Sequence, residues 1–312
     1  MKLQTLENSI SVLGALNMDL IMDLDRPAMP GETIVGNKFY TTPGGKGGNQ
    51  AVASARVSKN NSVVFLGIIG DDLYGKELKD YLNKENINTD NIIVDSNNHS
   101  GIAIIFSDQN GENYVNAVYG ANEKKENSIV EAFRKNLNNT KILITQNEMN
   151  QSITKDCMYL AKNNNIKIIL DPAPYKKELS MEYFSIADII TPNETEAEYM
   201  TGIKIKSIDD AKVAATKIIK KNINSCIITL GENGAYLMTQ NKEKYFPPHK
   251  IDKVEASVGA GDAFTGILGA SLSINIDLEE SIQLAIIGSA LSTTKSGAQD
   301  SMPLYDDIIK FL

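Results

Sequence analysis

The chain has 312 residues, of which 42% are hydrophobic and 22% charged, as in ordinary soluble globular proteins. A formal net charge of −8 disfavours a nucleic-acid-binding surface. No apolar run reaches the ~18 residues of a membrane span, and no basic, apolar leader predicts secretion. The two cysteines, Cys157 and Cys226, do not have the spacing of metal ligands. We expect both to be reduced thiols, as is usual for cysteines of cytoplasmic proteins.

Apolar strand-like runs alternate with helix-like segments along most of the chain. Strands are expected at residues 11–16, 63–69, 141–145, 166–170, 186–190 and 225–230. Helices are expected at residues 49–58, 75–84, 128–138, 151–163, 194–200 (ended by Gly202), 209–221, 260–274 and 278–293. This alternation predicts an α/β fold, in which a mostly parallel central sheet is covered by helices on both faces.

A hairpin interrupts this alternation. The strand-like residues 101–107 and 113–119 flank Gln109–Glu112, which contains the dipeptide Asn-Gly. Asn-Gly between two strand-like runs is a strong hairpin signal. We therefore predict that these two runs pair with each other outside the main sheet.

A small sheet is expected from this hairpin and an earlier segment. Residues 33–41 indicate an edge strand rather than a helix. Together the segments 18–42 and 100–120 predict a small sheet that covers a cleft as a lid. Because its strands come from two separate parts of the chain, we expect one domain over residues 1–312.

Two polar side chains follow the first expected strand. Asn17 and Asp19 lie directly after it, and ligands of open α/β sheets bind beyond the carboxyl ends of strands. An amide and a carboxylate can each bind a vicinal diol. The alternative is a local turn in which the Asn or Asp side chain bonds its own backbone.

A glycine-rich segment, Pro43–Gln50, precedes the first expected helix. Its four glycines allow the backbone to approach a ligand closely. The segment is not a P-loop, because no G-x-x-x-x-G-K-[ST] pattern occurs. Lys46 lies between the glycines, where its ammonium could meet an anionic or hydroxyl-rich ligand. A flexible turn is the alternative.

Two later segments allow a structural and a functional interpretation. In residues 191–196, Asn193 followed by Glu196 resembles a capping box, but the same pair could lie near phosphates and Mg²⁺. Residues 229–234 end a strand with two glycines, and they indicate either a turn or a loop lining a nucleotide.

The most informative segment, residues 258–266, opens a long apolar helix with small residues and one acid, Asp262. The free N–H groups at a helix start form an anion site. Asp262 either stabilises the helix dipole or takes a proton from a hydroxyl held beside the anion. The second role would be phosphoryl transfer to a hydroxyl.

Taken together, these motifs resemble the ribokinase (PfkB) family of sugar kinases. The resemblance is carried by segments in order over about 280 residues, as expected only of related chains. They are residues 13–19, 30–33, 44–50, 70–72, 120–122, 171–174, 191–196, 229–231, 259–262 and 295–299. The resemblance implies a three-layer sandwich with a β-sheet lid, and ATP-dependent phosphorylation of D-ribose at its 5-hydroxyl.

The resemblance also implies residue roles. Sugar contacts would come from Asn17, Asp19, Gly45, Lys46, Asn49, Glu148 and Asp262. Asp262 would be the general base, and the anion hole would be formed by the N–H groups of Gly259, Ala260 and Gly261. ATP would be bound by Asn193, Thr229, Gly231, Gly234 and Gly261. Glu196 would organise Mg²⁺ through water. The lid would also form a homodimer contact.

One position departs from the family pattern. Where family members carry an Asp that binds an activating monovalent cation, this chain has Ala256. Only the backbone of Ala256, Val258 and Gly297 would remain to bind K⁺, so we expect weak or absent K⁺ activation. Alternatives to the ribose kinase are a family kinase for deoxyribose, fructose or a nucleoside, or a catalytically silent sugar-binding regulator.

Overall fold

The structure, a computed structural model, describes residues 9–58, 62–108 and 113–312. Within them, the larger of two sheets has the strand order β13-β12-β11-β10-β9-β8-β1-β4-β5. Its strands are β1 (Ile10–Leu13), β4 (Val63–Gly70), β5 (Ile92–Asp95), β8 (Ile142–Thr145), β9 (Lys167–Leu170), β10 (Ile189–Ile190), β11 (Ser225–Thr229), β12 (Ala235–Thr239) and β13 (Glu243–Phe246). Every pairing from β5 across to β11 is parallel, whereas β12 and β13 are antiparallel. The predicted mostly parallel sheet is confirmed.

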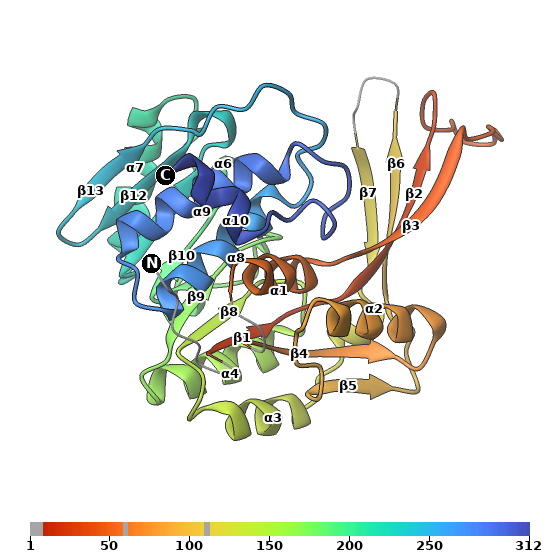
Figure 1. The fold of residues 1–312 in the computed structure, drawn as a ribbon, viewed down its shortest axis with the longest axis horizontal. Coiled ribbons are helices and arrows are strands. Elements are labelled where there is room, and N and C mark those ends of the chain that lie inside the picture. The colour runs from red at the N-terminus through yellow and green to blue at the C-terminus, as the bar shows by residue number, and fades with distance from the viewer. Residues whose placement is uncertain (1–8, 59–61, 109–112) are drawn as a thin grey trace.

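Helices cover both faces of this sheet (Figure 1). One face carries α1 (Lys46–Val57), α2 (Leu73–Lys84), α8 (Ala260–Ser273), α9 (Leu278–Ser292) and α10 (Tyr305–Ile308). The other carries α3 (Ser128–Asn136), α4 (Gln151–Asn163), α5 (Met181–Phe184), α6 (Glu194–Thr201) and α7 (Ile208–Ile219). The predicted three-layer sandwich is therefore confirmed. No helix in this described part of the chain combines the length and apolarity that crossing a bilayer needs.

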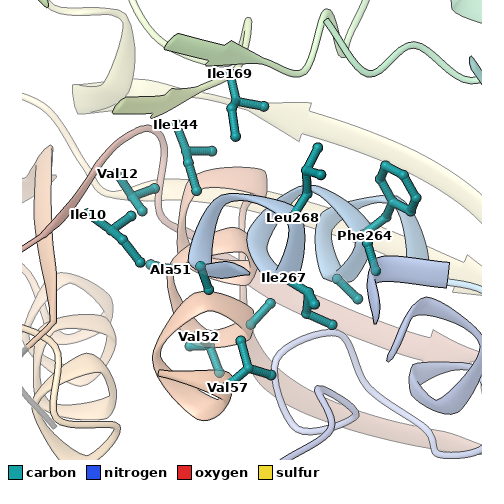
Figure 2. Close-up of a cluster of buried hydrophobic side chains, with 14 of the residues drawn as sticks. Ile10, Val12, Ala51, Val52, Val57, Ile144, Ile169, Phe264, Ile267 and Leu268 are labelled. Carbon is teal, nitrogen blue, oxygen red and sulfur yellow. The ribbon is translucent and has the colours of Figure 1, made fainter. Parts of the chain in front are cut away.

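The apolar core fixes α1 and α8 against the sheet (Figure 2). Ile10 and Val12 of β1 point towards these two helices, whereas Leu13 packs among the helices of the opposite face. Ile144 of β8 and Phe264 of α8 belong to the same cluster as Ile10. Burying one large apolar side chain stabilises a fold by about 1.5–3 kcal/mol. The first turns of α1 and α8 are thereby held at fixed positions relative to the strand ends.

The small sheet extends away from the main body (Figure 1) and has the strand order β3-β2-β6-β7. Its strands are β2 (Asn17–Asp23), β3 (Lys38–Gly44), β6 (Gly101–Ser107) and β7 (Asn113–Val118). β2 is parallel to β6, and the other two pairings are antiparallel. The sheet joins the two predicted segments. The predicted turn at Gln109–Glu112 lies outside the described residues.

The predicted edge strand at residues 33–41 begins too early. β3 begins only at Lys38, although it does lie at the edge of the small sheet. A closed turn precedes it, because Arg26 forms an ion pair with Glu32, and Glu32 also accepts a hydrogen bond from Met29 N–H at 2.9 Å. Just before Lys38, Asn37 N–H donates to the Asp23 carbonyl at 2.8 Å, where the pairing with β2 begins.

Two other strand predictions were also incomplete. The strand expected at residues 186–190 is only Ile189–Ile190, because the N–H groups of Ile186 and Ala187 donate to carbonyls of α5 in a turn. β5, β12 and β13 were not predicted from the sequence. β5 has only four residues, of which Ile92, Ile93 and Val94 are apolar, so its apolar run is short.

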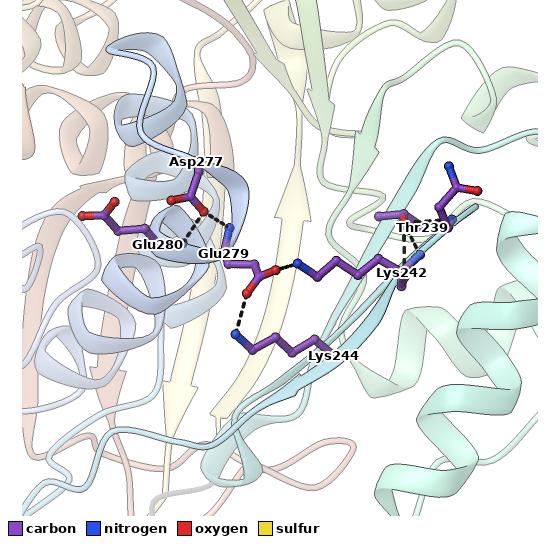
Figure 3. A network of polar contacts seen from close by, with 7 residues as sticks. Thr239, Lys242, Lys244, Asp277, Glu279 and Glu280 are labelled. Carbon is purple, nitrogen blue, oxygen red and sulfur yellow. Dashed lines mark hydrogen bonds and ion pairs between the residues drawn. The ribbon is translucent and has the colours of Figure 1, made fainter.

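A polar network ties the β12–β13 hairpin to α9 (Figure 3). Asp277 caps α9 by accepting hydrogen bonds from the N–H groups of Glu279 and Glu280. Glu279 also forms ion pairs with Lys242 and Lys244 of the hairpin. These contacts cross-link the antiparallel edge of the main sheet to the helix that packs beside α8.

Candidate active site

The candidate site opens at the first turn of α8. Gly259 precedes the helix with a φ of 80°, a left-handed conformation that favours glycine. The first helical hydrogen bond runs from Ala263 N–H to the Gly259 carbonyl at 2.8 Å, so the earlier N–H groups lie outside the helix ladder. Ala260 N–H donates to the Ser257 carbonyl at 3.3 Å. A Cβ at Gly261 would meet nothing within 4 Å, so this turn faces open space, as an anion site requires.

Asp262 lies in this turn and is only 4% exposed. Its Oδ2 accepts a hydrogen bond from Asn49 Nδ2 at 2.8 Å, and its Oδ1 accepts one from Gln50 Nε2 at 2.9 Å. Both donors belong to α1, which lies beside α8 (Figure 1). Two amides therefore orient the carboxylate, and each carboxylate oxygen retains a lone pair for a further donor.

Asn17 and Asp19 share one side of β2. In the small sheet, Asn17 pairs with Gly44 of β3 and with Gly101 of β6. A Cβ at Gly101 would lie 2.0 Å from Asn17 Oδ1, so glycine there makes room for the amide. Asn122 Nδ2 donates to the same oxygen at 3.1 Å. The polar pair therefore lies on a regular strand, not in the local turn considered as the alternative.

Lys46 is the first residue of α1, and Gly45 before it has a φ of 84°. Lys46 N–H donates to Glu148 Oε2 at 2.8 Å. Burial alone would lower the pKa of Lys46, but the surrounding carboxylates raise it above its ordinary value. Those carboxylates are Asp262, Asp171, Glu148 and Glu196. One ammonium therefore lies among several buried acids.

The buried acids are shifted towards their protonated forms. Burial and the charges of Glu148 and Asp262 raise the pKa of Asp19 to about 7. Burial also raises the pKa values of Glu148 and Asp171, and the charge of Lys46 opposes both shifts. Perturbed carboxyl groups gathered in one place are typical of functional sites.

Buried polar atoms without a hydrogen-bond partner also gather here. Buried polar groups are nearly always hydrogen-bonded, so such a concentration indicates a place for a polar ligand. Among the described residues, those bordering the site are Thr42 Oγ1, Asn49 Oδ1, Thr145 Oγ1, Gln146 Oε1 and Gln299 Oε1. Thr42 pairs across the small sheet with Asp19, and Gln299 Nε2 donates to the Gly44 carbonyl at 3.1 Å.

Asn193 and Glu196 form the capping box that was one of their two interpretations. Asn193 Oδ1 accepts a hydrogen bond from Glu196 N–H at 2.8 Å, and Glu196 Oε2 accepts one from Asn193 N–H at 2.9 Å. Burial raises the pKa of Glu196, although the Asn193 N–H opposes that shift. The box does not engage the Asn193 amide NH₂ or the second Glu196 oxygen. The capping box therefore does not prevent Asn193 and Glu196 from also lying near phosphates and Mg²⁺.

The segment at residues 229–234 is a turn between antiparallel strands. Thr229 ends β11 and forms a backbone bridge with Asn193. A Cβ at Gly231 would meet nothing within 4 Å. Gly234 is buried instead, and a Cβ there would lie 2.1 Å from the Phe246 carbonyl oxygen. Open space therefore adjoins Gly231 rather than Gly234.

Two loops meet beside the first turn of α8. Ala256 N–H donates at 3.2 Å to a carbonyl at the end of α9, and Val258 follows on the way into α8. Gly297, with a φ of 89°, belongs to the loop after α9. In that loop Ala298 lies against Gly259, since a Cβ at Gly259 would be 3.4 Å from the Ala298 Cα. Ala256 supplies no side-chain ligand atom.

No compact metal centre is evident in the described ranges, where no group of three or more His, Cys, Asp or Glu could hold an ion. Mg²⁺ in kinases binds chiefly to water and phosphate oxygens and needs only one or two carboxylates. A single buried carboxylate such as Glu196 therefore remains compatible with such an ion.

Three residues that contact Asp262 or its hydrogen-bond donors had no role predicted from the sequence. Gln50 Nε2 donates to Asp171 Oδ2 at 2.8 Å as well as to Asp262. Gln146 Nε2 donates to Gln50 Oε1 at 2.6 Å. Gln146 directly follows β8 and Asp171 directly follows β9. Gln146 and Asp171 could have been found in the sequence, because each is a polar residue directly after a buried parallel strand.

The chain is similar to carbohydrate kinases both in sequence and in structure. A family model described as pfkB family carbohydrate kinase matches residues 7–304. A ribokinase of Haemophilus influenzae is 33% identical over 307 residues, covering 98% of this chain and 99% of the relative. A deoxyribokinase of Salmonella typhi is 32% identical over 303 residues, covering 97% and 98%. The structure of Arabidopsis thaliana ribokinase complexed with ribose and ATP superposes with a TM-score of 0.90 at 26% identity, covering 97% of this chain and 98% of that one.

Proposed function

Because the chain belongs to the pfkB family of carbohydrate kinases, we propose that it transfers the terminal phosphoryl group of ATP to the 5-hydroxyl of D-ribose. The family predicted from the sequence motifs is confirmed, and with it the prediction of an enzyme. One observation carries the proposal of a sugar substrate. Polar side chains of the small sheet and of α1 converge with Asp262 at the open first turn of α8.

The proposed sugar site uses carboxylates, amides and one ammonium. Carboxylate and amide groups each present two hydrogen-bonding atoms, which suits the neighbouring hydroxyls of a furanose. Asn49 supports this role, because its Oδ1 is buried without a partner among the described residues while its Nδ2 holds Asp262. The proposed contacts are Asn17, Asp19, Gly45, Lys46, Asn49, Glu148 and Asp262.

Asp262 is the proposed general base. It accepts the proton of the 5-hydroxyl as that oxygen attacks the terminal phosphorus, and a positioned base typically contributes about 10²–10⁴-fold. Phosphoryl transfer otherwise depends on alignment and on stabilising charge on the phosphoryl oxygens. The N–H groups of Gly259, Ala260 and Gly261 supply that stabilisation. Ala260 N–H gives up its 3.3 Å bond to Ser257 to do so.

The nucleotide is proposed to lie between the starts of α6 and α8 and the end of β11. Its contacts are Asn193, Thr229, Gly231, Gly234 and Gly261, with Gly234 acting through the turn that it permits. Glu196 would hold Mg²⁺ through water, using the oxygen that the capping box does not engage. When bound, Mg²⁺ neutralises charge on the phosphates.

We propose little or no activation by K⁺. The candidate ligands, Ala256, Val258 and Gly297, offer backbone carbonyls alone, and no carboxylate side chain comes from position 256. A monovalent cation held only by neutral carbonyls loses the charge neutralisation that an Asp would supply. The supporting observation is therefore the alanine itself.

The chain is proposed to act as one domain, residues 1–312, in which the small sheet is the lid and the homodimer contact. One face of this sheet carries a cross-strand row of apolar side chains, Phe39, Met22, Phe106 and Tyr114. Phe39 is 57% exposed and Ile104 on the same face is 43% exposed. Exposed apolar patches of this kind mark interaction sites.

A cytoplasmic location is proposed from the two cysteines, which are buried and unpaired. Deoxyribose is the second candidate substrate, because a deoxyribokinase is nearly as similar to the chain as a ribokinase is. Fructose and nucleosides remain further alternatives within the family.

The test is ADP release with D-ribose, 2-deoxyribose, fructose and nucleosides as acceptors. We expect the highest kcat/KM with D-ribose and a 5-phosphate product. A higher kcat/KM with any other acceptor would refute the ribose assignment, and no turnover with any of them would refute the kinase proposal.

A further inference from the structure

Gln50 connects two buried carboxylates at the centre of the molecule. Its Nε2 donates to Asp262 Oδ1 at 2.9 Å and to Asp171 Oδ2 at 2.8 Å. Its Oε1 accepts from Gln146 Nε2 at 2.6 Å. All four side chains are 5% exposed or less, so this chain of contacts is closed to solvent.

We infer that Gln50 is a positioning residue for phosphoryl transfer and that Gln146 acts through it by fixing the direction of its amide. The inference rests on the proposed role of Asp262 as the base. Gln50 holds Asp262 Oδ1, while Asn49 holds Oδ2. Because both oxygens are held, the carboxylate cannot rotate away from the direction in which it meets the sugar hydroxyl.

The amide of Gln50 has only one productive orientation. An NH₂ group donates two hydrogen bonds, and Asp262 and Asp171 accept both. If the amide were reversed, its oxygen would face two carboxylates and its NH₂ would face the NH₂ of Gln146. The two carboxylates therefore select the orientation of the Gln50 amide that serves Asp262, and the bond from Gln146 Nε2 holds the amide in that orientation.

Backbone packing keeps Gln50 within reach of α8. Ser54 Oγ donates to the Gln50 carbonyl at 2.8 Å and to the Gly266 carbonyl at 3.0 Å, so one hydroxyl joins the two helices. A Cβ at Gly266 would lie 2.6 Å from the Gln50 carbonyl oxygen. The close approach of α1 and α8 thus depends on glycine at this crossing, and it sets the short distance from Gln50 to Asp262.

The surroundings of Asp262 are strongly charged, so the hydrogen bonds that hold its carboxylate matter. Charged groups reach it from every neighbouring element: Asp19 of β2, Lys46 of α1, Glu148 after β8, Asp171 after β9 and Glu196 of α6. Four of these five are acids, which disfavour a further negative charge. A hydrogen bond donated to a carboxylate favours its ionised form. The hydrogen bonds from Asn49 and Gln50 therefore hold a carboxylate that is surrounded by other acids.

The test replaces each glutamine by methionine, which keeps the length of the side chain and removes its amide. In Gln50→Met we expect kcat to fall about 10- to 100-fold, as expected for a misplaced catalytic group. The KM for D-ribose should stay within about threefold, because no ground-state sugar contact is removed.

Gln146→Met is the second variant, and the double variant shows whether it acts through Gln50. Gln146→Met should give the same kind of loss, and the double variant should lose no more than Gln50→Met alone. Gln240→Met is the matched control, because Gln240 Nε2 donates only to the Ile219 carbonyl, at 3.4 Å, in a turn remote from the site. Circular dichroism and thermal melts establish which variants fold. If Gln50→Met does not fold, the kcat and the KM of Gln146→Met alone test the inference.

Three results would overturn the inference. The first is a kcat for both single variants within about twofold of the wild type. The second is a loss confined to the KM, which would make Gln50 a binding residue. The third is a double variant whose losses multiply, which would make Gln146 independent. The acceptor panel with the wild type comes first, since an inactive wild type would refute the kinase proposal itself, and this inference with it.

Discussion

The carboxylate of Asp19 occupies the space that a side chain at Gly44 would need. A Cβ built on Gly44 would lie 2.2 Å from Asp19 Oδ2 and 2.5 Å from Oδ1. Asp19 pairs with Thr42 of β3, and Gly44 lies two residues further along β3 on the same face of the sheet, so glycine at position 44 leaves room for the carboxylate against the neighbouring strand. The placement of Asp19 is thus linked to the glycine-rich segment before α1.

Gly44→Ala should therefore displace Asp19 and weaken sugar binding. Hydrogen bonds to charged groups contribute about 1.5–3 kcal/mol, so we expect the KM for D-ribose to rise about 10- to 100-fold. The KM for ATP should change little. The KM for ATP is the internal control, because a general disturbance of the fold would raise it as well. Equal sugar KM values for Gly44→Ala and the wild type would contradict this linkage.

Asp19 should cost the folded protein stability at alkaline pH. Its pKa of about 7 lies above the ordinary value of 3.8 for an aspartate, so between these values the native state binds more protons than the unfolded state. The contribution of Asp19 to stability therefore falls as pH rises from about 4 to about 7, by at most ~4 kcal/mol.

Asp19→Asn should accordingly raise the melting temperature at pH 8 more than at pH 4, while it weakens D-ribose binding. Thermal melts at the two pH values and ribose titrations measure both effects. A melting temperature that falls equally at both pH values would show that burial of this charge is not destabilising.

Restoring a carboxylate at position 256 should create a dependence on K⁺. In the wild type we expect the rate to change little when K⁺ replaces a larger organic cation at constant ionic strength. In Ala256→Asp the same replacement should raise the rate, because the carboxylate adds charge to the neutral carbonyl ligands. Steady-state rates across a K⁺ series provide the measurement. Equal K⁺ dependence in the two proteins would count against the role of this position.

A charge on the apolar face of the small sheet should dissociate the proposed dimer. Ile104→Lys places an ammonium on the face that carries Phe39. Light scattering after gel filtration should report a dimer for the wild type and a monomer for the variant. Val213→Lys is the control, because Val213 is 55% exposed on the remote helix α7. A monomeric wild type would rule out the dimer.

Local signals in the sequence were sufficient to predict most of the main layers. The helix at residues 194–200 ends at Gly202, whose φ of 74° closes α6 as the glycine predicted. The Asn193–Glu196 spacing likewise predicted the capping box that is present. These features depend on residues a few positions apart, which a single sequence shows directly.

Features that depend on distant residues could not be predicted in this way. Gln50 contacts Asp171 and Asp262, which lie 121 and 212 positions away in sequence. Nothing in the local pattern around Gln50 distinguishes it from other helix residues, because its partners are brought together only by the sheet order and the crossing of α1 and α8. Residues 18–42 were predicted to belong to the small sheet, but the pairing of Asn17–Asp23 with two later segments could not be predicted.

Replacing Asp262 by Asn tests the central claim most directly. The amide preserves the shape of the side chain but cannot accept the proton of the hydroxyl, so we expect kcat to fall about 10²- to 10⁴-fold. Calorimetric affinities for D-ribose and for ATP should remain within about threefold of the wild type. Turnover near the wild-type rate in Asp262→Asn, with both ligands bound, would contradict the assignment of Asp262 as the base.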